Sequence, residues 1–139
     1  MTSEAEKVSD VMNRHPAALR AGTELTAAVD TLLKLRLSGM PVVDGSDKVV
    51  GFLSEQDCLR SLIVSSYHCE GSPLVDDLMH IEVLSVRAED GLVDVAESMI
   101  REKPKVYPVV DEDNRLIGVL TRSQVLGALK DMRRACDLG

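Results

Sequence analysis

The stretch Met40-Pro41-Val42-Val43-Asp44, which leads to Gly-Phe-Leu-Ser-Glu-Gln-Asp at residues 51–57, decides the fold because the chain contains it twice. The second copy is Tyr107-Pro108-Val109-Val110-Asp111, followed by Gly-Val-Leu-Thr-Arg-Ser-Gln at residues 118–124. The two copies stand at a constant offset of 67 residues, and the match runs from residues 8–62 to residues 75–129 without insertion or deletion. Such a repeat predicts two equivalent structural units in one chain.

The two copies predict the same order of elements. Apolar residues recur at helical spacing from Leu25 and again from Leu92. Two apolar runs around a polar turn then predict a β-hairpin, at residues 41–53 and 106–120. An extended segment precedes the first helix, at residues 17–20 and 83–87, and a closing helix follows the hairpin, at residues 55–64 and 122–132. The sequence therefore predicts an α+β fold of two β-α-β-β-α repeats packed with pseudo-two-fold symmetry.

The domain organisation follows from the same match. Residues 1–64 form repeat 1, residues 65–73 form a linker that contains Gly71-Ser72-Pro73, and residues 74–139 form repeat 2. Each repeat of roughly 60 residues is marginal for folding alone, so we expect the two to bury surface against each other. Apolar residues of the closing helices, such as Leu62, Ile63 and Leu129, are expected on the surface and favour a homodimer.

Composition excludes several classes of partner. The formal net charge of −7 opposes binding to nucleic acid and to anionic membranes, and the 2% aromatic content leaves few side chains on which bases could stack. No apolar run approaches the roughly 20 residues of a membrane span. The polar N-terminus lacks a signal-peptide core, and three cysteines without CxxC spacing indicate reduced thiols. We therefore expect a cytoplasmic protein with no metal site.

Ser54 and Asp57 are the first candidates for ligand binding, because they stand where a strand ends and a helix begins. The first turn of a helix attracts phosphate, and the Asp57 carboxylate could accept hydrogen bonds from both hydroxyls of a ribose. The same spacing is also close to a capping box, and Thr121 with Gln124 matches that pattern outright. The spacing alone favours neither interpretation.

The repeated motif resembles the CBS domain, the unit named after cystathionine β-synthase, which usually occurs in pairs as a Bateman module. The resemblance covers nearly the whole chain and rests on the two proline-containing strands and the two segments that begin at Gly51 and Gly118. It implies a regulatory module that binds adenine nucleotides or related adenosyl compounds, and in which the aspartate of Gly-x-x-Ser/Thr-x-x-Asp holds the ribose.

The resemblance also implies two clefts, each built from one motif and from segments of the other repeat. Ser54, Asp57 and Gly39 would form the first cleft with Leu84, Pro104 and Lys105, and Thr121, Gln124 and Arg122 would form the second with Ala17, Leu37 and Ser38. Gln124 has no charge, and the loss of a charged hydrogen bond should weaken binding about tenfold. Gly39 stands where the family often has a basic residue, which disfavours triphosphates.

The leading hypothesis is therefore a stand-alone sensor with one stronger and one weaker site, for AMP, ADP, ATP or S-adenosylmethionine. The alternative is a ligand-free scaffold that oligomerises or docks to a partner enzyme or transporter. An unidentified effector protein fits either hypothesis. We do not expect an enzyme, because the sequence shows no Ser/His/Asp arrangement and no glycine-rich phosphate loop. No cofactor is required.

Overall fold

The computed structural model describes residues 6–68, 71 and 73–138, with side-chain surroundings for all of these except residues 65–68, 137 and 138. The chain divides into two compact units. Unit 1 comprises Met1–Pro16, Leu84–Glu112 and Ile117–Gly139, and unit 2 comprises Ala17–Val83 and Asp113–Leu116. Each unit thus combines most of one sequence repeat with the opening segment of the other.

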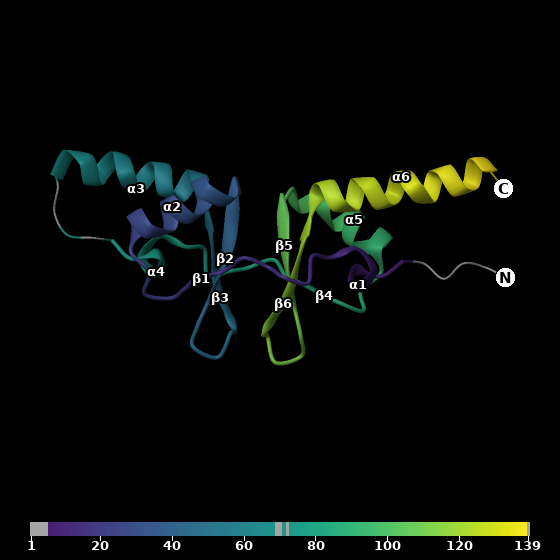
Figure 1. Ribbon diagram of the computed structural model, residues 1–139, viewed down its shortest axis with the longest axis horizontal. Helices are drawn as coiled ribbons and strands as arrows, with labels where there is room; N and C mark the ends of the chain where they lie inside the picture. Colours follow the sequence, from purple (N-terminus) through teal and green to yellow (C-terminus); the bar gives the residue numbers. More distant parts are fainter. Residues whose placement is uncertain (1–5, 69–70, 72, 139) are drawn as a thin grey trace. The chain divides into compact units, whose positions relative to one another are not determined.

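Unit 2 contains a three-stranded sheet in the order β1-β2-β3. Its elements in chain order are β1 (Leu19–Arg20), α2 (Leu25–Leu35), β2 (Gly39–Val43), β3 (Val49–Ser54), α3 (Glu55–His68) and α4 (Val75–Leu78). β1 pairs with β2 in parallel and β2 pairs with β3 antiparallel, with an irregularity between Val42 and Val43. Figure 1 shows α2 and α3 next to each other on one side of this sheet.

Unit 1 repeats the arrangement with a sheet in the order β4-β5-β6. Its elements are α1 (Val8–Val11), β4 (Val86–Arg87), α5 (Leu92–Glu102), β5 (Val106–Val110), β6 (Leu116–Thr121, of which Leu116 belongs to unit 2) and α6 (Arg122–Leu138). The parallel pairing of β4 with β5 matches that of β1 with β2. The predicted α+β class and the β-α-β-β-α order are confirmed.

Some expected boundaries and exposures are wrong. α3 continues to His68 and α6 to Leu138, beyond the predicted ends at Val64 and Met132, because no glycine or proline stops either helix there. Leu62 and Leu129 are not exposed but pack, half-buried, against the two cores. Ile63 is exposed, as expected.

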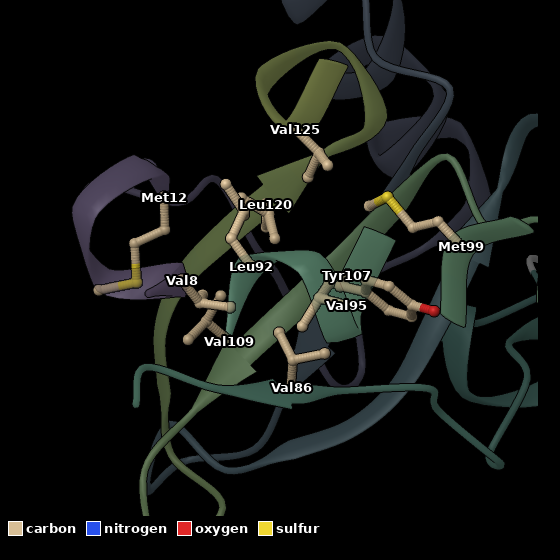
Figure 2. Packing of buried hydrophobic residues seen from close by; sticks show 10 residues of the cluster. All are labelled: Val8, Met12, Val86, Leu92, Val95, Met99, Tyr107, Val109, Leu120 and Val125. Atoms are coloured by element: carbon tan, nitrogen blue, oxygen red, sulfur yellow. The ribbon is translucent and has the colours of Figure 1, made fainter. Parts of the chain in front are cut away.

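Each unit has its own hydrophobic core, and the opening segment of the other repeat supplies part of it. Val75 of α4 is fully buried with Leu25, Val42 and Leu53. In unit 1, Val8 and Met12 close the equivalent core. Figure 2 shows these two side chains with others of the same core, among them Val109 and Leu120. Because burying one such side chain contributes about 1.5–3 kcal/mol, both opening segments are integral to the units.

Gly51 and Gly118 allow the opening segments to approach the sheets closely. The backbone of His80 exchanges two hydrogen bonds with Phe52, each 2.9 Å long, and Asn13 pairs with Val119 in the same way. A Cβ atom on Gly51 would overlap Met79 Sδ, and one on Gly118 would lie 2.8 Å from the carbonyl oxygen of Asn13. The two glycines of the repeated motif are therefore steric requirements of this packing.

The hairpin of repeat 1 ends in a turn that Asp44 stabilises. Its Oδ1 accepts the backbone N–H groups of Ser46 at 2.8 Å and Lys48 at 3.1 Å. These bonds hold the pKa of Asp44 below its usual value, with smaller contributions from the charges of Lys48 and Arg20. Asp47 takes the left-handed conformation at φ 64°, which aspartate tolerates better than most residues.

Within the described residues, no helix is both long and apolar enough to cross a membrane.

Candidate functional site

The first turn of α3 is closed by reciprocal hydrogen bonds between Ser54 and Asp57. Asp57 Oδ2 accepts the Ser54 backbone N–H at 3.0 Å and the Ser54 hydroxyl at 2.8 Å. The Asp57 backbone N–H donates to Ser54 Oγ at 3.2 Å. This is a capping box, so the capping interpretation of the sequence is correct. The arrangement fixes the Asp57 carboxylate at the end of β3.

The other carboxylate oxygen of Asp57 faces two basic side chains. His80 Nε2 lies 3.2 Å from Asp57 Oδ1, and Arg60 NH1 lies 3.8 Å from the same atom. The Asp57 side chain is only 4% exposed, whereas those of His80 and Arg60 are 65% and 75% exposed. A buried carboxylate needs such partners because desolvation penalises an unpaired charge. Asp57 is thus the buried member of a cluster whose two basic side chains are exposed.

A pocket of about 340 Å³ opens beside this cluster, and Asp57, Arg60, Ser61 and Val64 of α3 form one wall of it. Asp77 and Leu78 of α4 form the other wall. The volume falls within the range of about 300–1,000 Å³ typical of small-molecule sites. The two walls come from different sequence repeats but from one compact unit. Asp57 therefore has an open space beside it within unit 2.

The equivalent position in unit 1 keeps the cap but loses the charge. Gln124 Oε1 accepts the Thr121 backbone N–H at 2.8 Å, and the Gln124 N–H donates to Thr121 Oγ1 at 3.1 Å. At the 67-residue offset, Asn13 replaces His80 and Gly127 replaces Arg60. All three positions of the cluster therefore hold side chains without an ionisable group in unit 1.

The remaining predicted residues of unit 2 lie near the start of β2. Gly39 is buried, and a Cβ there would lie 2.5 Å from Phe52 Cε1, so a side chain at this position requires the ring to move. Packing thus accounts for the lack of a basic residue at position 39. The Ser38 carbonyl accepts the first N–H of α3, from Glu55, at 2.9 Å. Ala17 and Leu37 are half-buried against the core.

The other predicted residues belong to unit 1. The Lys105 carbonyl accepts the Arg122 backbone N–H at 2.9 Å, which is the counterpart of the Ser38 bond. The Lys105 and Arg122 side chains are exposed, Pro104 is half-buried, and Leu84 is exposed. Because Leu84, Pro104 and Lys105 lie in unit 1 and Asp57 in unit 2, their joint role in binding stays a prediction, as does that of Ala17, Leu37 and Ser38 with Thr121.

Sequence reasoning missed the two basic residues beside Asp57 and the other residues that line the pocket. Arg60 stands one turn after Asp57 on α3, and this spacing is a signal that could have been used. His80 is distant in the sequence, and only its place directly after the repeated Met79 marked it.

The neighbouring Cys58 is buried, as predicted. Burial raises the pKa of its thiol, and the negative charges of Asp57 and Glu55 add to this effect.

Paired repeats, exchanged opening segments and a capped Ser-x-x-Asp motif together define a class of tandem domain pair. The family model of the CBS domain matches the chain twice, at residues 8–64 and 75–131. The chain belongs to the CBS domain family and carries a tandem pair of these domains. The resemblance stated from the sequence is confirmed.

Similar proteins and structures come from several contexts. The crystal structure of CBSX2 from Arabidopsis thaliana is 30% identical, with a TM-score of 0.81, and the match covers 94% of this chain and 99% of that one. A structure of CBSX2 in complex with AMP is 31% identical, with a TM-score of 0.79, and covers 91% and 98% of the two chains. The chloroplastic CBSX1 of A. thaliana is 30% identical over 83% of this chain.

A transporter component is also related. The choline transport ATP-binding protein OpuBA of Bacillus subtilis is 26% identical over 92% of this chain. The chain spans 59% of the length of CBSX1 and 32% of that of OpuBA. CBS pairs of this kind thus occur as parts of longer proteins.

Proposed function

We propose that this CBS pair is a regulatory module that binds an adenosyl ligand of the AMP class at the Asp57 pocket. The observation that carries the proposal is a buried carboxylate, fixed by a helix cap, on the wall of a pocket of about 340 Å³. A ribose presents two adjacent hydroxyl donors, which a carboxylate accepts well. The CBSX2 complex with AMP supports the choice of ligand, since that protein is 31% identical over nearly its whole length.

The charges of the pocket favour a monophosphate over a triphosphate. Asp57 and Asp77 bring two carboxylates to the walls, while Arg60 brings one guanidinium. Position 39, occupied by glycine, offers no further cation. Because like charges at short range repel and desolvation strengthens the effect, we expect affinity to fall from AMP to ADP to ATP. S-adenosylmethionine, whose sulfonium is cationic, would not meet this repulsion.

We further propose that the Thr121/Gln124 position is the weaker site and that ligand binding changes the association of the module with itself or with an effector protein. The uncharged Gln124, Asn13 and Gly127 support the first point. Exposed apolar side chains on α3, Leu59 and Ile63, support the second. A ligand with different affinities for two arrangements is sufficient to shift between them.

A ligand-free scaffold is the second candidate, and one observation favours it. The Asp57 carboxylate is almost fully covered and already has partners on both oxygens. In that case the carboxylate serves the fold alone, and the pocket stays empty at physiological ligand concentrations.

Calorimetric titration with AMP, ADP, ATP and S-adenosylmethionine separates the two candidates. Asp57→Asn is the variant to compare, because asparagine keeps an acceptor for the cap but loses the charge. We expect AMP to bind the wild type and to bind Asp57→Asn at least about tenfold more weakly. A ligand present at 100 times its Kd should also add about 2.7 kcal/mol to the free energy of unfolding. Equal binding to both proteins, or binding to neither, would refute the proposed site.

A further inference from the structure

His80 occupies the side of Asp57 that a ribose would need. Asp57 Oδ2 already accepts two hydrogen bonds from Ser54, and each carboxylate oxygen offers two acceptor positions. Oδ1 is therefore the oxygen that remains for a ligand. His80 Nε2 lies at hydrogen-bond distance, 3.2 Å, from that atom. With the imidazole in place, Asp57 has too few free acceptor positions to bind both hydroxyls of a ribose.

The backbone of His80 is fixed while its side chain faces solvent. Both the N–H and the C=O of His80 are bonded to Phe52 of β3, and Gly51 keeps Met79 in close contact with the same strand. The His80 side chain is 65% exposed, so it can turn away from Asp57 without disturbing the core. The bond between His80 and Asp57 can therefore open by a side-chain rotation alone.

The arrangement belongs to unit 2 and has no histidine at the equivalent position of unit 1. Asn13 is the counterpart of His80, and its backbone pairs with Val119 as that of His80 pairs with Phe52. The Asn13 side chain, however, accepts the backbone N–H of His15 at 2.9 Å, within its own loop. Asn13 is therefore the matched control position for substitutions of His80.

We propose that His80 is a latch on the ribose-binding carboxylate, which an adenosyl ligand must displace to bind. The inference rests on the proposed function of the Asp57 pocket and adds a residue that sets its affinity. His80 lowers the affinity for ribose-bearing ligands because part of the binding free energy is used to break its bond to Asp57. The exposed imidazole turns into solvent when the ligand enters, and Arg60 stays beside the carboxylate.

The test compares AMP affinity among the wild type, His80→Ala, Asn13→Ala, Asp57→Asn and the double variant His80→Ala/Asp57→Asn by calorimetry. A single hydrogen bond whose donor side chain is largely exposed contributes modestly, so we expect His80→Ala to bind AMP about two- to fivefold more tightly than the wild type. Asn13→Ala should leave the affinity of the Asp57 pocket unchanged, because Asn13 belongs to unit 1. In the Asp57→Asn background the gain should disappear, because the latch has lost its partner. The gain should also shrink for 2′-deoxy-AMP, which presents one hydroxyl fewer.

The outcomes distinguish the proposed role of His80 from the proposed binding of an adenosyl ligand at the Asp57 pocket. AMP binding that depends on Asp57 but is unchanged or weakened in His80→Ala would overturn the latch and leave the proposed function intact. A gain in His80→Ala that persists in the Asp57→Asn background would also overturn the latch. Binding of AMP to neither the wild type nor His80→Ala would overturn the proposed function itself. Binding that is detectable in His80→Ala alone would support both.

Discussion

Gln124 accepts a hydrogen bond from the backbone N–H of Thr121 in the same geometry that Asp57 uses with Ser54. The two side chains therefore close the first turns of α6 and α3 in the same way. The two side chains differ in the acceptor atoms that remain for a ligand, because an amide has one acceptor oxygen and no charge. The cap is thus conserved between the repeats while the charge is confined to one of them.

Gln124→Asp should create a charged site in unit 1. Aspartate fits the cap at the equivalent position of unit 2, so the fold should be retained. We expect the weaker AMP site to gain about tenfold in affinity, which calorimetry would register as a second binding event. Gln124→Asn, which changes the length but not the charge, is the control. An unchanged isotherm for Gln124→Asp would show that this position does not contact the ligand.

Gly51→Ala should destabilise the chain and Gly127→Ala should stabilise it. The new Cβ at position 51 overlaps Met79 Sδ, and such overpacking costs about 1–3 kcal/mol. Gly127 lies within α6 with no neighbouring atom within 4 Å of its would-be Cβ. Replacing a helical glycine by alanine contributes about 1 kcal/mol. Urea unfolding of the two variants measures both changes, and equal midpoints would contradict the steric role of Gly51.

The free energy of unfolding should fall in acid, partly because the Asp44 carboxylate becomes protonated. The turn N–H groups of Ser46 and Lys48 hold its folded pKa below the unfolded value of 3.8, so the folded state binds its proton less readily. The contribution is complete above the unfolded pKa and is lost as the pH falls through the folded pKa. Asp44→Asn should therefore flatten the fall in stability below about pH 4. Thermal unfolding between pH 2 and 7 measures this, with the exposed α2 residue Asp30→Asn as control.

Cys58 and Cys136 should react with iodoacetamide at different rates. The Cys58 thiol is buried and its pKa is raised, so the reactive thiolate is scarce, whereas Cys136 is exposed. We expect Cys58 to be labelled at least about tenfold more slowly at pH 7.5, and at the rate of Cys136 only after unfolding. Peptide mapping by mass spectrometry follows each cysteine separately. Equal rates in the folded protein would mean that α3 opens locally.

The periodic parts of the sequence predicted the fold well, because helical spacing from Leu25 and the apolar runs around the hairpins depend on local patterns. The ends of α3 and α6 were wrong, since no strong stop signal follows Val64 or Met132. The capping box was visible in the spacing of Ser54 and Asp57. The approach of His80 to Asp57 could not be predicted from spacing, because it depends on α4 packing beside α3.

The opening segments have a consequence for dividing the chain. A cut between His68 and Pro73 would separate the core that holds Leu25 from Val75, which fills it, and would likewise leave the core around Leu120 without Val8. Neither fragment would carry a full set of interior side chains. Mixed in solution, however, each would supply the piece missing from the other, so the two halves should reconstitute a native protein although each is unfolded by itself.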